Sequence, residues 1–558
     1  MLQLLVLILL SISGLVANEP GLIHVIDLPD KEEVIIDSIV IHINNALEGS
    51  RANTKIEGYI FNMGNRLHIK TRPKTVLKHL LFKPGELVSK TTLVESERNL
   101  RNQLFFADAK IEIDSISTQL VLTHITVIDQ WSTVPIVGIN RVGNEWGYGF
   151  GVSESNLLGT GQIISIYHYQ DITTAGNILS YLNPSYTKNR LKLAFKLIDN
   201  STGYYSSASI QKPLLSKYDK NSFSFSYSVS KSSRFYYYDG NLLGDNNQFH
   251  IGETNSLVEF YDVFKKYLYM DYTRSYGFDN KIDIRFYGKF FEMKHDSTNV
   301  YLLNADKENY LPDKLMIPLR NDILFCMEFK LYKKEYYQTN NLTNFKWIEN
   351  LNKIKLISFT LGRNIRQLGA ENNNIFLEWN VKYSNFIMDK HFIFANSNLN
   401  YYLTSLGKKE NGSFDAKIRY QYKFTPLTNA KISTYWKHYI GKSSYEQLLL
   451  GESTGLYGYP NFYYTGDRLL LINGELTMIT NLEIMTVIPA ISIFTSLGNT
   501  FTDNNHIDLD KMHSSIGFGL RFGLSRSAGT IVNHINFSWP LDNSMEGPSI
   551  SIRSKSSL

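Results

Sequence analysis

Most of this chain after Trp131 alternates apolar and polar residues with a period of two. Residues 222–229 read Ser-Phe-Ser-Phe-Ser-Tyr-Ser-Val, and residues 282–287 read Ile-Asp-Ile-Arg-Phe-Tyr. This period places successive side chains on opposite faces of a β-strand, here one apolar face and one polar face. Roughly 425 residues of such strands can fold as a soluble sandwich or solenoid with the apolar face inside, or as a transmembrane barrel with that face toward lipid.

The residue composition favours the barrel. The 558 residues include 36 Tyr and 32 Phe but only 14 Pro, and proline is rare in paired strands because it cannot donate to the hydrogen-bond ladder. After the N-terminal segment, no run of about 18 apolar residues predicts a membrane-spanning helix. The predicted fold class is therefore mainly β. With strands of about 10 residues and long outer loops, residues 132–558 are expected to form an antiparallel transmembrane β-barrel of about 16 strands.

Several function classes are disfavoured by composition. A net charge of +5 is small for a nucleic-acid binder that relies on phosphate contacts. The one cysteine, Cys326, excludes an internal disulfide, and no Cys or His cluster has metal-ligand spacing. Residues 451–455 match the G-x-S-x-G pattern of serine hydrolases, with Asp467 and His534 downstream, but a strand pattern follows instead of the required helix. We therefore expect no enzyme, no catalytic residue, no metal and no cofactor.

The N-terminal part differs from the rest of the chain. Residues 1–17 are apolar and end in Leu-Val-Ala, which predicts a cleaved export signal. An anchor helix is the alternative, although spanning a membrane takes about 20 apolar residues. Residues 34–128 mix strand and helix periods in the order strand, helix, helix, strand, strand, with Pro73 at a first helical turn and Ser89 as a helix cap. This order predicts one small α+β domain.

Four groups of residues carry a resemblance to a known family. They are residues 65–72 with 80–86 and 95–101; residues 129–131 with 155–161; residues 455–459 with 465–471; and residues 515–522 with 548–552. The first group resembles a POTRA domain, the second the start of a barrel, the third a signature loop and the strand after it, and the fourth the last strands. Together they resemble the outer-membrane superfamily of POTRA domains plus a barrel, which includes BamA, TamA and two-partner secretion transporters such as FhaC.

The resemblance implies a function and a location. A POTRA-like domain at 34–128 would lie in the periplasm and the barrel at 132–558 in the bacterial outer membrane, surrounded by its lipid. The implied activity is protein transport or insertion: an unfolded or extended client is captured by the POTRA-like domain and passed through or along the barrel. No cofactor or nucleic acid is implied, and a periplasmic partner is compatible with it. The alternative is a passive outer-membrane channel or receptor without protein transport.

The resemblance also implies a site inside the barrel. The lumenal loop motif would be Gly455, Leu456, Tyr457, Gly458 and Tyr459, and its partners on the barrel wall Glu475, Phe494, Ser496, Gly498 and Arg521. The family's loop arginine and wall acid are replaced here by Tyr457 and Ser496. Losing one partner of a buried pair is costly, whereas losing both can be nearly neutral. We therefore expect the loop to stay in the lumen through a different contact; relaxed selection in an inactive paralogue is the alternative.

Overall fold

The computed structural model describes most of the chain. The described residues are 22–29, 32–47, 55–117, 119–142, 145–170, 174–187, 189–236, 259–296, 320–342, 345, 349–442, 446–484, 486–502, 508–526, 531–542 and 548–556. The predicted export signal at residues 1–17 lies outside them.

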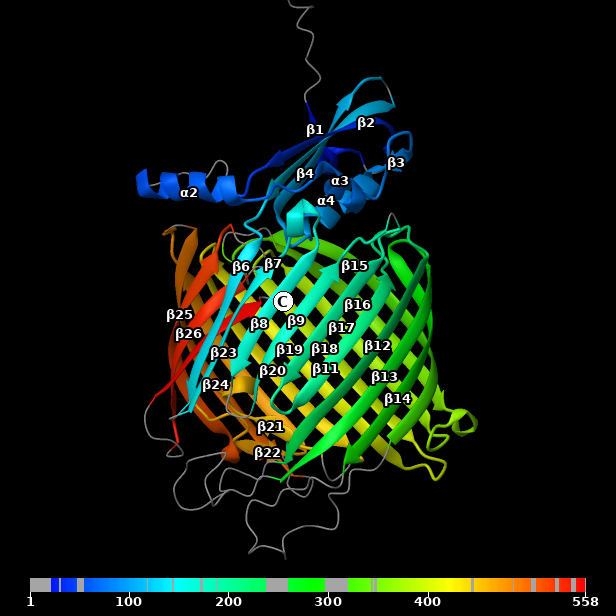
Figure 1. The fold of residues 1–558 in the computed structure, drawn as a ribbon, viewed down its shortest axis with the longest axis vertical. Helices are drawn as coiled ribbons and strands as arrows, with labels where there is room; N and C mark the ends of the chain where they lie inside the picture. The colour runs from blue at the N-terminus through cyan, green and yellow to red at the C-terminus, as the bar shows by residue number, and fades with distance from the viewer. Residues whose placement is uncertain are drawn as a thin grey trace, which may run out of the picture.

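In the described residues, twenty antiparallel strands close into one barrel (Figure 1). The strands are β6 (Thr133–Val142), β7 (Glu145–Glu154), β8 (Ile163–Gln170), β9 (Ala175–Asn183), β10 (Lys192–Asn200), β11 (Gly203–Lys212), β12 (Asn221–Tyr236), β13 (Glu259–Tyr276), β14 (Asn280–Asp296), β15 (Arg320–Thr339), β16 (Glu349–Asn364), β17 (Ile375–Ile387), β18 (His391–Leu403), β19 (Lys409–Thr425), β20 (Thr428–Ile440), β23 (Arg468–Ile479), β24 (Val487–Phe501), β25 (His513–Leu524), β26 (Ile531–Pro540) and β27 (Ser549–Ser556).

The predicted number of about 16 strands was wrong. That estimate assumed long loops, but several connections are two-residue hairpins, such as residues 201–202 between β10 and β11 and residues 426–427 between β19 and β20. Less of the chain is therefore taken up by loops, and more strands fit into the same length.

The apolar face of the strands points outward. On β15, Phe325, Met327, Phe329 and Leu331 are 41 to 50% exposed, whereas the alternating Cys326 and Glu328 are buried. Glu328 faces the lumen, where it lies 2.7 Å from the Arg285 guanidinium of β14. An apolar outer surface around a polar, ion-paired interior is the arrangement of a transmembrane barrel and the reverse of a soluble sandwich.

The N-terminal domain is an α+β unit with a five-stranded sheet in the order β1-β4-β5-β2-β3. Its elements are β1 (Ile23–His24), η1 (Val25–Asp27), β2 (Glu33–Asn44), α2 (Lys55–Leu67), α3 (Pro73–His79), β3 (Leu87–Ser89), α4 (Lys90–Arg101), β4 (Phe106–Ser115) and β5 (Leu120–Asp129). The sheet begins before the expected start at 34, because β1 pairs with β4. None of the helices in the described residues is long and apolar enough to cross a membrane.

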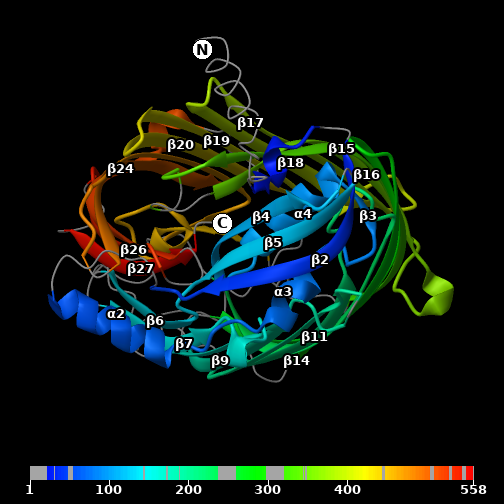
Figure 2. The same ribbon diagram turned by 90° about the horizontal axis from the view of Figure 1, so that it is seen from above.

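Local sequence signals and burial in the domain's core account for helices α3 and α4. Ser89 caps α4 by accepting a hydrogen bond from the Thr92 amide, and Leu93 and Leu100 on this helix are buried. Helix α3 begins at Pro73, as the sequence predicts. Helix α2 is an addition that the sequence reading missed, because Gly58, Asn62 and Gly64 weaken its helical pattern. Seen from above, the sheet, α3 and α4 lie over one mouth of the barrel, called here the near mouth (Figure 2).

Candidate functional site: the lumenal loop and the seam

The connection between β20 and β23 folds back into the barrel. Its residues 446–467, called here the lumenal loop, contain the short strands β21 (Leu448–Leu450) and β22 (Tyr464–Gly466) and the 3-10 turn η6 (Glu452–Thr454). Leu450, Leu456 and Tyr459 of the loop are fully buried and form a cluster with Leu469 and Leu471 on the inner face of β23. Burial of these apolar side chains holds the loop against the wall.

Two glycines of the predicted motif are required by the backbone. Gly455 has φ +112° and Gly458 has φ +91°, a region that side chains with a Cβ rarely adopt. A Cβ at Gly458 would also lie 3.2 Å from Pro540 on β26. The motif therefore needs glycine at both places to turn next to the wall.

The predicted loop and wall residues lie close together. The Tyr457 ring packs edge-on against Phe494 of β24, with 5.0 Å between ring centroids. The Ser496 hydroxyl, two residues further along β24, donates to the Gly455 carbonyl over 3.4 Å. Gly498 leaves room for the loop, since a Cβ there would lie 3.3 Å from Leu450. Tyr457 and Ser496 thus line one loop–wall contact, made by ring packing and a neutral hydrogen bond.

Glu452 is a buried carboxylate that the sequence reading did not select as a site residue. One of its oxygens accepts from the Gly458 amide at 2.7 Å, and the other accepts from the Ser551 hydroxyl of β27 at 2.9 Å. The side chain therefore closes the motif turn on itself and fastens it to the last strand. A carboxylate inside a tyrosine-rich loop was the available signal, but it was read only as part of the G-x-S-x-G pattern.

Tyr459 fastens the other side of the motif. Its hydroxyl lies 2.9 Å from both the Ser514 carbonyl oxygen and the Asp542 carboxylate. Asp542 is also 2.7 Å from Nδ1 of His513 on β25. The loop is thus bonded to strand β25 and to the connection between β26 and β27.

Glu475 and Arg521 belong to a polar network on the inner wall. The Arg521 guanidinium lies 2.9 Å from Glu475, which Lys431 of β20 also contacts at 2.6 Å. Arg521 donates to the Asn536 side-chain oxygen at 2.7 Å, and Asn536 lies 3.4 Å from the Ser551 hydroxyl. Hydrogen bonds therefore run from β20 through β23, β25 and β26 to β27, and from there to Glu452 of the loop.

Removing one member of this network is expected to destabilise the barrel. Arg521→Met leaves the carboxylate of Glu475 with Lys431 alone, and breaking a buried ion pair costs about 3–5 kcal/mol. We expect a loss of stability at the low end of this range, because Lys431 still pairs with Glu475. The measurement is the temperature at which the folded band disappears on a denaturing gel. The control is Arg363→Met, since that arginine is exposed at the end of β16; equal shifts in both variants would contradict the role of the network.

The barrel closes between β27 and β6 through a short ladder, called here the seam. In the part of the chain that the structure describes, three residue pairs form it, Ile550 to Ile552 with Arg141 to Ile139. The neighbouring ladders are longer, with eight pairs between β26 and β27 and ten between β6 and β7. Ser551, the middle seam residue of β27, is the one that donates to Glu452. The shortest ladder among the described strands of the wall is thus bonded to the lumenal loop.

The N-terminal domain contacts the barrel near its first strands, at the connection between β7 and β8. The Asp129 carboxylate accepts from the Thr71 amide and hydroxyl, and the Asn156 amide donates to the same hydroxyl at 2.8 Å. Burial raises the pKa of Asp129 although these hydrogen bonds act in the opposite direction. Gly159, with φ +73°, lies against the Lys70 carbonyl, where a Cβ would be 2.4 Å away. Residues 129–131 and 155–161, which the motifs placed at the start of the barrel, therefore meet at this junction.

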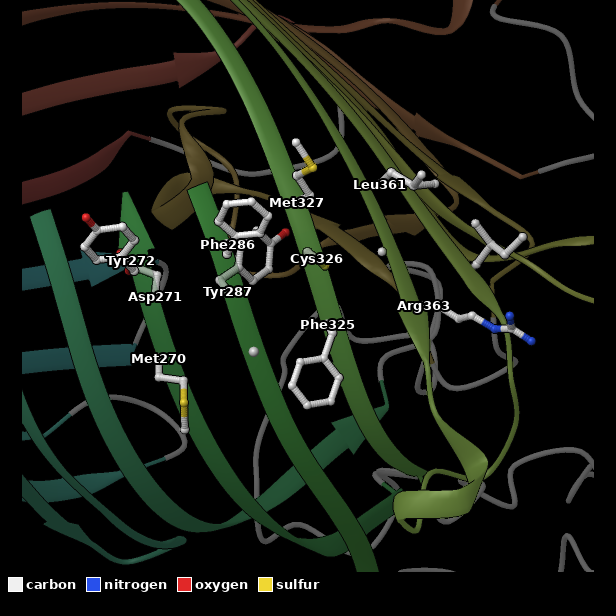
Figure 3. A pocket seen from close by; sticks show the side chains of 13 residues that line it. Met270, Asp271, Tyr272, Phe286, Tyr287, Phe325, Cys326, Met327, Leu361 and Arg363 are labelled. Atoms are coloured by element: carbon white, nitrogen blue, oxygen red, sulfur yellow. The ribbon is translucent and has the colours of Figure 1, made fainter. Parts of the chain in front are cut away.

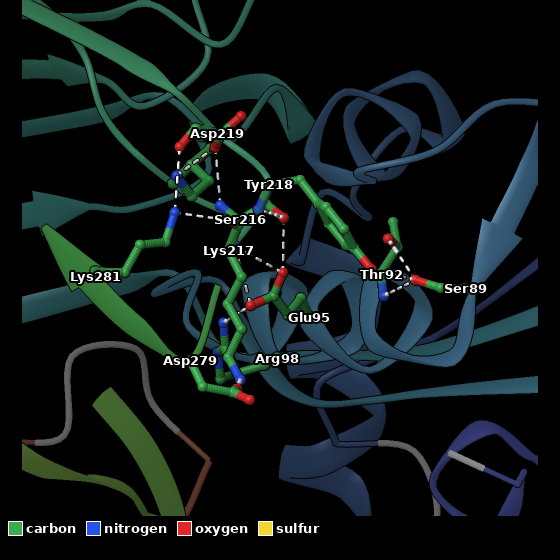
Figure 4. A network of polar contacts seen from close by, with 11 residues as sticks. Ser89, Thr92, Glu95, Arg98, Ser216, Lys217, Tyr218, Asp219, Asp279 and Lys281 are labelled. Atoms are coloured by element: carbon green, nitrogen blue, oxygen red, sulfur yellow. Dashed lines mark hydrogen bonds and ion pairs between the residues drawn. The ribbon is translucent and has the colours of Figure 1, made fainter. Parts of the chain in front are cut away.

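A second contact joins α4 to the near mouth (Figure 4). Glu95 accepts from the Ser216 hydroxyl at 2.7 Å and from the Lys217 amide at 3.1 Å, both in the turn between β11 and β12. The Arg98 guanidinium lies 3.7 Å above the Tyr336 ring of β15. With Glu95 buried against the barrel, helix α4 is held over the mouth by hydrogen bonds to a charged group.

Two further features do not add to this site. A hollow of about 710 Å³ lies around β13 to β17, lined by Met270, Phe286, Phe325, Cys326 and Leu361 among others (Figure 3). Most of its lining belongs to the apolar outward face of the wall. Ser453 of the G-x-S-x-G pattern lies in the 3-10 turn η6, which has three residues and no following α-helix. In the described residues, no group of three or more His, Cys, Asp or Glu could hold a metal ion.

Comparison with known proteins gives distant structural relatives. No family model and no curated protein sequence matches this chain. Solved structures similar to it include CdiB from Escherichia coli (12% identity, TM-score 0.44, covering 95% of this chain and 93% of that chain) and BamA from Haemophilus ducreyi lacking POTRA domains 1–3 (10%, 0.37, 93% and 84%). The ferric preacinetobactin receptor BauA from Acinetobacter baumannii is also similar (9%, 0.34, 81% and 85%). BamA, which the sequence motifs resemble, is thus among the solved structures to which this chain is similar.

Proposed function

We propose that this chain is an outer-membrane protein transporter or insertase. Its N-terminal domain acts as a periplasmic POTRA-like domain that captures an extended protein client, which then passes through or along the barrel. The observation that carries the proposal is the seam of three residue pairs, whose middle residue Ser551 is bonded to the lumenal loop. A large closed barrel with an apolar outer surface supports the outer-membrane location.

The N-terminal domain has an edge to which a client can bind. Strand β3 pairs with β2 at Glu33 to Ile35, and the backbone of Ile36 is bonded to Gly85 and Glu86. In the described residues, β2 after Ile36 therefore forms the outer edge of the sheet in the order β1-β4-β5-β2-β3. An extended peptide can add to such an edge through backbone hydrogen bonds with little dependence on sequence. Because α4 is held at the near mouth, a client on this sheet would already lie next to the barrel.

Locking the seam is expected to abolish lateral release of a client. The variant Ile139→Cys/Ile552→Cys joins a pair across the seam, and Ile535→Cys/Ile552→Cys joins the same β27 residue to β26 as a matched control. Both are made with Cys326→Ala and closed with a short cross-linker that reacts with thiols. The measurement is insertion of newly made outer-membrane proteins. Loss in the first variant but not in the control supports insertion along the barrel, whereas unchanged insertion in both excludes an opening seam.

Depletion of the protein tests transport as a whole. Quantitative proteomics of outer membrane and medium is compared with and without this chain. Loss of particular outer-membrane proteins indicates insertion, and loss of particular secreted proteins indicates secretion through the lumen. If neither fraction changes, the chain is not a protein transporter, and the passive channel or receptor becomes the better description.

A further inference from the structure

Helix α2 has three different faces. Glu57, Phe61 and Gly64 are buried against the rest of the molecule, while Ile56 and Met63 lie on a second, exposed face. Tyr59 is on this second face as well. Ile56 is 67% exposed, Tyr59 70% and Met63 47%. Spacings of three, four and seven residues put them on one stripe. Exposed polar residues form the third face, which comprises Lys55, Asn62 and Arg66.

The buried face fixes α2 next to the seam strand β6. A Cβ on Gly64 would lie 2.8 Å from Leu47 and 3.4 Å from the ring of Trp131, which comes two residues before β6. The Asn65 side-chain oxygen accepts from the Leu47 amide at 3.0 Å. The position of the helix is therefore set by packing and a hydrogen bond.

The helix lies just above the near mouth, at the outer edge of the barrel. Figure 1 shows it across the rim, extending past the edge of the barrel, and Figure 2 shows it outside the barrel outline beside β6. The outward side chains of the neighbouring β6 and β7 are apolar, with Val137, Phe150 and Val152 44 to 58% exposed. The helix that carries the apolar stripe thus lies beside strands whose outward face is apolar as well.

We propose that α2 is an interfacial helix whose apolar stripe is buried in the membrane leaflet at the near mouth, beside the seam. A helix with one apolar face, a polar face and basic residues lies in the plane of the headgroups. Lys55 and Arg66 on the polar face suit lipid phosphates, and Tyr59 suits the boundary between acyl chains and water. The partner is the lipid surface itself, and the inference does not depend on protein transport.

Accessibility of spin labels in the full-length protein tests this assignment. With Cys326→Ala as background, Ile56→Cys and Met63→Cys place a nitroxide on the apolar stripe. Asn62→Cys is the matched control, adjacent in sequence but on the polar face. The protein is reconstituted in phosphatidylglycerol-containing nanodiscs with one copy per disc. We expect labels at 56 and 63 to be relaxed several-fold more by oxygen than by a water-soluble nickel chelate, and the label at 62 to show the opposite preference.

Three results would overturn the proposal. Equal access of the nickel chelate to all three labels would mean that the stripe is in water. Protection at 56 and 63 that appears only in vesicles with many copies of the protein would assign the stripe to a second copy. Protection that appears only after an unfolded client is added would assign it to the client.

Discussion

Replacing Glu452 with alanine is expected to release the lumenal loop and to leave the barrel conducting. The change removes hydrogen bonds from the Gly458 amide and the Ser551 hydroxyl to the Glu452 carboxylate, which is fully buried. Hydrogen bonds to charged groups contribute about 1.5–3 kcal/mol each, so the two together amount to about 3–6 kcal/mol. Since about 1.4 kcal/mol is a factor of ten in a population, the released loop should become at least 100-fold more populated. Single-channel conductance in planar bilayers measures the release.

A control from the same turn separates loop release from general damage. Ser453→Ala alters an exposed side chain next to Glu452 and should leave conductance unchanged; it also tests the hydrolase pattern, because any esterase activity would need this serine. Glu452→Gln keeps the shape and one acceptor oxygen, so its effect should be intermediate. Wild-type conductance in Glu452→Ala, with the folded band retained on the gel, would show that this carboxylate does not hold the loop.

The same bond links the loop to the seam. Ser551 pairs with Asn140 across the seam and donates to Glu452 from the loop side. A displaced loop would therefore remove a contact from the middle of a ladder in which the structure describes three pairs. Loop release and seam opening are then expected to favour each other, a coupling that follows from one shared residue.

The outward direction of the apolar residues could be predicted from the sequence, but the strand number could not. Alternation such as Ile-Asp-Ile-Arg at residues 282–285 depends on local geometry alone, and the structure confirms a closed antiparallel barrel. Strand number depends on how much chain the loops use, and hairpins such as residues 426–427 carry little sequence signal. Helix α2 was missed because its apolar stripe faces outward and its glycines resemble a loop.

The residues of the candidate site could be predicted from the sequence only in part, for a related reason. The loop and wall positions came from a resemblance, and the structure brings Tyr457, Phe494 and Ser496 together. Glu452 and Ser551 are 99 residues apart, and no local pattern links a carboxylate in a turn to a serine on the last strand. Contacts of this kind follow only from closure of the barrel.

Ser496→Asp is expected to displace the lumenal loop from the wall of the barrel, and the additional change Tyr457→Arg is expected to return the loop to its place. Ser496 is fully buried and donates to the Gly455 carbonyl, so an aspartate there would place a carboxylate against a carbonyl oxygen without a cation. An unpaired buried charge costs about 3–5 kcal/mol. Tyr457 already packs on Phe494, two residues from Ser496 on the same strand, which brings an arginine at 457 within reach of the new carboxylate.

A double-mutant cycle on loop release measures this coupling. Residues in contact couple by about 0.5–3 kcal/mol, and the high end is expected for a newly formed buried pair. Tyr457→Phe is the control, because it preserves the ring that packs on Phe494. This change should destabilise the loop by no more than about 1 kcal/mol. If the effects of Ser496→Asp and Tyr457→Arg add within about 0.3–0.5 kcal/mol, the two positions do not meet. The loop would then be held by Glu452 and Tyr459 and not by the contact between positions 457 and 496.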